Sequence, residues 1–207
     1  MKLMAFVGSP RRGSNTDLLI DSAIAGAQSL GTMEVEKIYL YDADIKTCTG
    51  CLACTALKGS QPCPLQDAMD AVLCRMEQAD AFIFGTPNHV HSMSAGLVNL
   101  FCRMQPLIKM DIIRDAAGAI IGADATTRIN GKRAVVIVSQ GDFSYTQSAL
   151  IFRALDSNMR DFQLKKIAEV FSAGNLERAA VQDKPADLAA AFAAGAKLPG
   201  MPLSSKA

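Results

Sequence analysis

Short apolar runs alternate with helical stripes of apolar residues along most of the chain. Five segments have the pattern of buried strands: residues 2–7, 33–40, 81–85, 134–139 and 167–171. Each is followed by a segment with apolar residues at helical spacing: residues 15–30, 65–79, 94–107, 146–161 and a last helix opened by Pro185. This alternation predicts an α/β fold with a doubly wound, five-stranded parallel sheet and helices on both faces.

The 207 residues contain no Pro/Gly/Ser-rich linker or block of charge that would divide them. We therefore expect one domain over residues 1–207, with Asn15 or Thr16 as the N-cap of its first helix. Two segments interrupt the alternation. Residues 46–64 form a cysteine-rich loop, and residues 109–131 fit neither period, which leaves a short helix or a hairpin as the alternatives there.

The charge balance restricts the class of partner. With 21 Lys and Arg against 20 Asp and Glu, the net charge is +1, so binding to nucleic acid through bulk charge is not expected. No apolar run is long enough to span a membrane. The opening residues MKLMAFVGSP contain too short an apolar stretch for a signal peptide, which favours a cytoplasmic protein.

The loop after the first strand is suited to an anion. Its candidate ligands are Ser9, Arg11, Arg12, Ser14, Asn15 and Thr16. A helix N-terminus offers N–H groups without partners and the positive end of a dipole, to which these side chains add further donors. No carboxylate precedes Asp17 in this loop. The alternative is that the hydroxyl and amide groups only cap the helix while the arginines are solvated.

The loop lacks the Gly-Lys-Ser/Thr ending of a nucleoside-triphosphate site and also lacks GxGxxG, so a terminal monophosphate such as that of FMN suits it best. The loop after the third strand can lie along a flat heterocycle, with candidate contacts from Pro87, Asn88, His89, Val90, Ser92 and Met93. Gly141, after the fourth strand, permits close approach to a ring. His89 is interpreted as a hydrogen-bonding residue as readily as an acid or base.

These motifs resemble a known family. GSPRRGSNT is similar to the phosphate loop, and TPNHVHSMSAGLVNLFCR to the ring-binding loop and following helix, of the flavodoxin-like, NADPH-dependent FMN reductase family. The resemblance covers about residues 1–175. It implies sheet order 2-1-3-4-5, bound FMN, NAD(P)H as a candidate electron donor, and a homodimer or homotetramer. The family's usual aromatic residue after the proline is replaced here by Asn88-His89.

Four cysteines are crowded into the second loop. Cys48, Cys51 and Cys54 form a CxxCxxC run, and Cys63 follows after eight residues. In a reducing compartment this crowding indicates metal binding rather than disulfides. The compact run favours a 4Fe-4S cluster over zinc, although thiols without metal are a third interpretation. The remaining cysteines, Cys74 and Cys102, are expected in the core.

Together these features predict an oxidoreductase similar to the iron-sulfur flavoprotein branch of the family, which moves electrons between a two-electron donor, FMN and a 4Fe-4S cluster. One alternative is a cluster-free NAD(P)H-dependent FMN or quinone reductase with structural cysteines. Another is a flavin-bearing electron carrier served by a ferredoxin-type partner. Each alternative has a small molecule or a redox protein as its partner, and none involves nucleic acid or a membrane.

Overall fold

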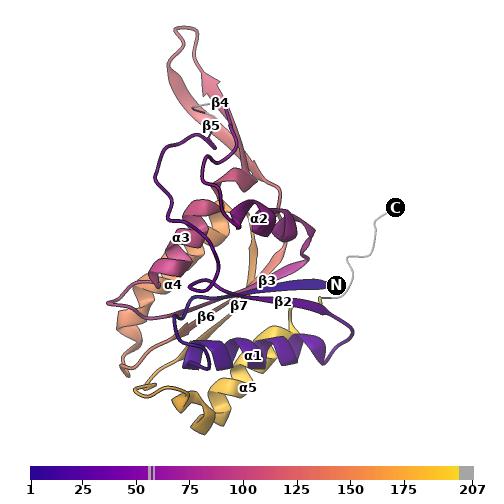
Figure 1. Ribbon diagram of the computed structural model, residues 1–207, viewed down its shortest axis with the longest axis vertical. Helices are drawn as coiled ribbons and strands as arrows, with labels where there is room; N and C mark the ends of the chain where they lie inside the picture. Colours follow the sequence, from indigo (N-terminus) through magenta and orange to yellow (C-terminus); the bar gives the residue numbers. More distant parts are fainter. Residues whose placement is uncertain (56, 58, 201–207) are drawn as a thin grey trace.

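A five-stranded parallel sheet forms the centre of the computed structural model, which describes residues 1–55, 57 and 59–200 (Figure 1). Its strands are β1 (Lys2–Val7), β2 (Glu34–Tyr39), β3 (Ala81–Pro87), β6 (Arg133–Ser139) and β7 (Lys165–Ser172). They lie in the order β2-β1-β3-β6-β7. When only the strands of this sheet are numbered, the order is 2-1-3-4-5, so the predicted flavodoxin-like topology is confirmed.

Helices cover both faces of the sheet, as predicted. The helices are α1 (Asn15–Gln28), α2 (Met69–Gln78), α3 (Ala95–Arg103), α4 (Tyr145–Asp161) and α5 (Pro185–Ala196). Figure 1 shows α1 and α5 below the sheet and the other three helices above it. A short 3-10 helix, η3 (Ala180–Asp183), precedes α5. None of the helices in the described ranges is both long and apolar enough to cross a bilayer.

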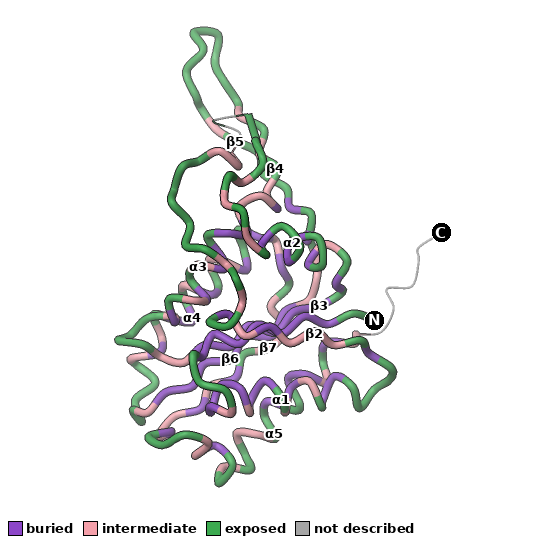
Figure 2. The backbone as a smooth tube through the Cα atoms, in the orientation of Figure 1, coloured by how far each residue is buried: buried purple, intermediate pink, exposed green. Residues whose placement is uncertain are grey.

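Alternating side chains of the strands divide the interior into two cores. In β1, Met4 and Phe6 belong to the core beneath α2, α3 and α4, whereas Leu3, Ala5 and Val7 belong to the core against α1 and α5. This follows from the two-residue period of a strand, and it leaves the sheet buried on both sides (Figure 2).

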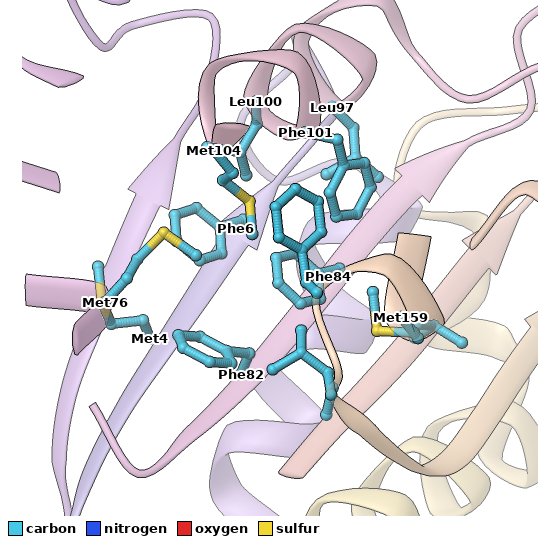
Figure 3. Close-up of a cluster of buried hydrophobic side chains, with 14 of the residues drawn as sticks. Met4, Phe6, Met76, Phe82, Phe84, Leu97, Leu100, Phe101, Met104 and Met159 are labelled. Atoms are coloured by element: carbon cyan, nitrogen blue, oxygen red, sulfur yellow. The ribbon is translucent and has the colours of Figure 1, made fainter. Parts of the chain in front are cut away.

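Phenylalanines fill the upper core (Figure 3). The rings of Phe6 and Phe84 are stacked with centroids 5.3 Å apart, and Phe101 of α3 lies 5.3 Å from Phe84. Each fully buried phenylalanine stabilises the fold by about 1.5–3 kcal/mol relative to an exposed one. Phe101 therefore packs α3 against the sheet.

Two glycines allow α1 and α5 to touch through their backbones. A Cβ at Gly26 would lie 1.9 Å from the carbonyl oxygen of Phe192, and one at Gly195 would lie 1.8 Å from that of Ala23. No side chain fits at either contact. The α1–α5 pair is thus a backbone-to-backbone crossing, which holds the first and last helices of the fold together.

Residues 109–131, whose pattern fits neither a helix nor a strand, form mainly an antiparallel hairpin, which is one of the two expected alternatives. Strands β4 (Ile108–Arg114) and β5 (Ile120–Thr127) follow a short 3-10 helix, η2 (Gln105–Leu107), and pair only with each other. Figure 1 shows the hairpin projecting from the layer of α2 and α3. At its base the N–H of Arg128 donates to the carbonyl oxygen of Leu107 over 3.0 Å.

Several expected details were wrong. The helix expected over residues 65–79 begins only at Met69, because the Asp67 carboxylate accepts the N–H of Met69 and holds the preceding residues outside the helix. The helix expected over residues 94–107 ends at Arg103 and is followed by η2, which contains Pro106. Cys74 and Cys102 are exposed rather than in the core.

Candidate functional site

Loops that leave the carboxyl ends of β1, β3 and β6 surround a cavity, as expected for an open parallel sheet. The lining residues are Ser9, Arg11, Ser14, Asn15, Thr16, Pro87, Asn88, His89, Ser139, Gln140, Gly141, Asn175 and Arg178. The cavity therefore brings together most of the predicted cofactor-binding residues. Arg12, Val90, Ser92 and Met93 lie outside its lining, and Ser139, Gln140, Asn175 and Arg178 are additional.

The loop between β1 and α1 presents the start of α1 to the cavity. Ser14, rather than Asn15 or Thr16, is the N-cap, and its hydroxyl accepts the N–H of Asp17 over 3.3 Å. The hydroxyl of Ser9 accepts the N–H of Arg11 over 3.2 Å. The first N–H groups of a helix have no carbonyl partner within it, so the N-terminus of α1 presents donors and a positive dipole end to an anion.

The two arginines of this loop have different surroundings. Arg11 lines the cavity, whereas the guanidinium of Arg12 pairs with Asp42 at 2.7 Å and lies 4.0 Å from the ring centroid of Tyr39. The side chain of Arg178 lines the cavity instead and donates a hydrogen bond to the carbonyl of Arg12. No local motif marks Arg178, because it reaches the loop only through the tertiary fold.

A buried carboxylate lies directly behind this loop. Asp17 accepts the N–H of Gly13 over 2.6 Å and forms an ion pair with Lys37 of β2. Burial alone would lower the pKa of Lys37, but the hydrogen bonds that Lys37 donates to Asp17 and Asp21, together with their charges, outweigh burial and raise it. Lys37 therefore stays cationic and neutralises the carboxylate nearest the start of α1.

Asn88 connects the loop after β3 to the neighbouring strand β6 by hydrogen bonds. The N–H of Asn88 donates to the carbonyl oxygen of Ser139 over 2.8 Å, and its amide nitrogen donates to Gln140 over 2.9 Å. Val90 is 90% exposed, with a positive φ of 51°. Met93 packs against the upper core.

Gln140 organises the third loop. Its side-chain nitrogen donates to the carbonyl oxygens of Asp142 and Ser144 over 2.9 and 2.8 Å, while its side-chain oxygen accepts from Asn88. The hydroxyls of Thr16 and Ser139 are hydrogen bonded at 2.6 Å, which links the first loop to the third. The sequence pattern marked this loop only through Gly141, since the roles of its polar side chains depend on contacts across the sheet.

All four predicted metal-ligating cysteines line a second, smaller pocket. Cys48, Cys51, Cys54 and Cys63 share it with Cys102 of α3, and Arg103 and Pro106 also contribute to its wall. Burial raises the pKa of the Cys54 thiol, and the neighbouring Cys63, Cys48 and Cys51 raise it further. The second loop thus folds back so that thiols nine or more residues apart face the same space.

The thiols do not converge on one point. Among the described residues, no three His, Cys, Asp or Glu side chains are grouped closely enough to hold a single metal ion. A cubane cluster differs from a zinc site in this respect, because each thiolate binds a different iron and the sulfur atoms lie around the cluster. The described cysteines therefore line one pocket without forming a site for a single ion.

Several known proteins are similar to this chain in sequence. The family described as NADPH-dependent FMN reductase matches residues 1–150. An iron-sulfur flavoprotein of Methanocaldococcus jannaschii is 32% identical over 151 residues, 73% of this chain and 75% of that protein. An iron-sulfur flavoprotein of Methanosarcina thermophila is 26% identical over 152 residues, 73% and 76% of the two chains.

Solved structures share the fold at lower identity. A Trp repressor binding protein from Bacillus subtilis superposes with a TM-score of 0.60 at 21% identity, over 96% of this chain and 98% of that one. An FMN-dependent NADH-azoreductase from Bacillus anthracis, solved with FMN, gives 0.67 at 14% identity over 95% and 98%.

The chain belongs to the NADPH-dependent FMN reductase family. It is accordingly an FMN-dependent oxidoreductase with a flavodoxin-like fold.

Proposed function

We propose that this protein is an iron-sulfur flavoprotein that moves electrons between a two-electron donor, FMN and a 4Fe-4S cluster. The observation that carries the proposal is that Cys48, Cys51, Cys54 and Cys63 all line one pocket beside α3. That helix begins immediately after the loop assigned to the flavin ring. The names of the two relatives described above support the same function.

The cavity at the carboxyl edge of the sheet fits FMN in its donor chemistry. We assign the phosphate to the N-terminus of α1, with hydroxyls from Ser9, Ser14 and Thr16 and the guanidinium of Arg11. Arg178 is the additional cation on this cavity. Arg12 and Asn15 support the loop, since Arg12 pairs with Asp42, and the Asn15 amide donates to the Glu177 carbonyl over 2.7 Å.

We assign the flavin ring to Pro87, Asn88, His89 and Gly141. A Cβ at Gly141 would be no closer than 3.4 Å to its neighbours, so the protein itself does not require glycine there, and the missing side chain leaves room for a ring. Val90, Ser92 and Met93 shape the loop from outside the cavity lining. Asn88 is held by Ser139 and Gln140, which gives the ring a rigid edge to lie against.

Bound FMN supplies the conversion between two-electron and one-electron transfer. The chain's own residues bind the phosphate and orient the ring, and α3 runs from the loop assigned to the ring to the wall of the cysteine pocket. We assign no side chain as a proton donor or nucleophile, and His89 acts as a positioning group in the lining. NAD(P)H is the proposed two-electron donor, and a small molecule or a ferredoxin-type protein is the proposed redox partner.

We further propose that residues 1–207 act as one domain, that the protein works in the cytoplasm, and that it assembles as a homodimer or homotetramer. The second candidate is a cluster-free NAD(P)H-dependent FMN or quinone reductase. The lack of a single-ion site among the described cysteines favours it, because that arrangement is also expected of thiols without metal.

Anaerobic purification followed by quantitation of FMN, iron and acid-labile sulfide distinguishes the iron-sulfur flavoprotein from the cluster-free reductase. The proposed function requires about one FMN and about four irons with four sulfides per chain. Stoichiometric FMN without iron would establish the cluster-free reductase instead. A colourless protein that does not take up added FMN would refute both.

A further inference from the structure

The segment that leads into the cysteine loop lies along one side of α3. The N–H of Gly96 donates to the hydroxyl of Tyr41 over 3.2 Å. One turn further on, the side-chain oxygen of Asn99 accepts the N–H of Cys48 over 2.9 Å, while its nitrogen donates to the carbonyl of Lys46 over 3.2 Å. Figure 1 shows this loop running past α3 toward the base of the hairpin.

Arg103, one turn beyond Asn99, joins the two ends of the cysteine loop. Its Nη1 donates to the carbonyl oxygen of Lys46 over 2.7 Å and to Asp67 over 2.6 Å, and its Nη2 donates to Asp67 over 3.0 Å. The Asp67 carboxylate also accepts the N–H of Lys46 over 2.8 Å. Residues before the first thiol and after the last are therefore fixed to the same ion pair.

This ion pair is almost inaccessible to water. The side chains of Arg103 and Asp67 are 2% and 1% exposed. Burial of two charges is costly unless good geometry and further hydrogen bonds compensate, and the bidentate pairing with the backbone contacts of Lys46 and Met69 provides both. Arg103 also forms part of the wall of the cysteine pocket.

Within the loop, backbone hydrogen bonds from Gln61 to Ala53 over 2.8 Å and from Ser60 to Thr55 over 2.9 Å join the loop only to itself. Between β2 and α2 the described residues form no regular helix or strand long enough to fix the four thiols. Their positions therefore depend on where the ends of the loop are held. The nine residues of α3 span about 14 Å, and at the other end of the helix the N–H of Ser94 donates to Thr86 over 2.9 Å.

We propose that Asn99, Arg103 and Asp67 are positioning residues that hold the cysteine pocket in register with the flavin-ring loop through α3. The inference rests on the proposed function, since it concerns retention of the cluster, but it also predicts a property of the iron-free chain. Outer-shell groups of this kind typically change metal affinity about 10- to 100-fold when they are removed.

The test compares Arg103→Gln and Asn99→Leu with the wild type. Both variants should lose iron to a chelator under anaerobic conditions about 10- to 100-fold more readily, with an unchanged FMN-to-protein ratio. Asn99→Asp keeps the acceptor for the Cys48 N–H and should restore part of the retention. Arg75→Gln, which breaks the exposed pair with Glu36, is the matched control and should leave iron retention unchanged.

Hydrogen exchange of the iron-free proteins gives the second measurement. Peptides that cover residues 45–55 should exchange faster in both variants than in the wild type, whereas peptides that cover residues 9–16 should not. Wild-type exchange and wild-type iron retention in Asn99→Leu would overturn the inference, even if Arg103→Gln does not fold. A wild type without iron would refute the cluster, and the exchange comparison would still decide whether these residues hold the loop.

Discussion

The carboxylate of Asp17 forms an ion pair with the ammonium of Lys37 behind the loop that begins α1. The two side chains are 4% and 18% exposed. A carboxylate in the first turn of a helix competes with any other anion for the same dipole and the same N–H groups. Lys37 removes most of that competition by neutralising Asp17, although it does not line the cavity itself.

Replacement of Lys37 by Met should therefore weaken FMN binding about tenfold, the equivalent of about 1.4 kcal/mol. The variant leaves the Asp17 charge uncompensated, which should also lower the free energy of unfolding by about 1–3 kcal/mol. Fluorescence titration of apoprotein with FMN measures the first effect. Lys2→Met, which removes an exposed pair with Glu34, is the control, and equal FMN affinities in the two variants would contradict the prediction.

The arginines of the phosphate loop should differ in their effects on FMN affinity. Arg11→Ala and Arg178→Ala should each cost about 1.5–3 kcal/mol of FMN binding, because each removes a charged donor from the cavity. Arg12→Ala should cost less, because its guanidinium is already paired with Asp42. Riboflavin, which has no phosphate, should bind the Arg11→Ala and Arg178→Ala variants as well as it binds the wild type. A parallel loss of riboflavin affinity would indicate a disturbed cavity instead.

Cys63 and Cys102 provide a direct test of which thiols would bind the proposed cluster. Both line the pocket, but only Cys63 continues the loop that carries the CxxCxxC run. Cys63→Ser should reduce bound iron strongly while FMN is retained, whereas Cys102→Ser should leave iron content unchanged. Iron analysis of the two variants, with exposed Cys74→Ser as a control, measures this. Iron loss in Cys102→Ser alone would reassign the fourth ligand to α3.

The sheet and its helices could be predicted from the sequence because they depend on local periodicity. Alternation in β1 and the stripe of α1 are visible in the residues themselves. Helix ends were less predictable, since Asp67 stops α2 through a side-chain hydrogen bond that pairs it at the same time with Arg103. Exposure of Cys102 was missed because a helical pattern does not show which face its neighbours leave open.

The candidate sites were predictable where one segment carries several donors, as in the loop from Ser9 to Thr16. Arg178 and Asn175 could not be found in this way, because residues more than 150 positions away meet that loop only after β7 has joined the sheet. The neutralising role of Lys37 was equally hidden. It comes from the neighbouring strand, so its position depends on the parallel register of β1 and β2.

Acid should lower the free energy of unfolding by protonating Asp67. Its hydrogen bonds with Arg103 lower the pKa of the carboxyl from 3.8 to about 2, despite burial. The corresponding stability, about 2 kcal/mol, is present above pH 3.8 and is lost as the pH falls from about 4 to about 2. Denaturant unfolding of the iron-free protein across this range measures it. Asp67→Asn should show a smaller decline over the same range, and an identical decline would contradict the assignment.

Addition of a single methyl group where the backbones of α1 and α5 cross should destabilise the protein. Gly195→Ala favours a helix by up to about 1 kcal/mol, but its Cβ would overlap the Ala23 carbonyl at 1.8 Å. We expect a net loss of about 1–3 kcal/mol in the free energy of unfolding, as is typical of overpacked cores. Thermal unfolding measures the loss. Gly122→Ala, where a Cβ would be 3.8 Å from its neighbour, should be close to neutral.

The hairpin of β4 and β5 lends itself to variation in length. The hydrogen bond between Arg128 and Leu107 closes its base, and β6 takes its register from β3 without help from either strand. Residues can therefore be added or removed near the Gly118 turn without shifting the central sheet. The hairpin can therefore change in length during evolution while the cavity at the carboxyl edge of the sheet and the cysteine pocket keep their shape.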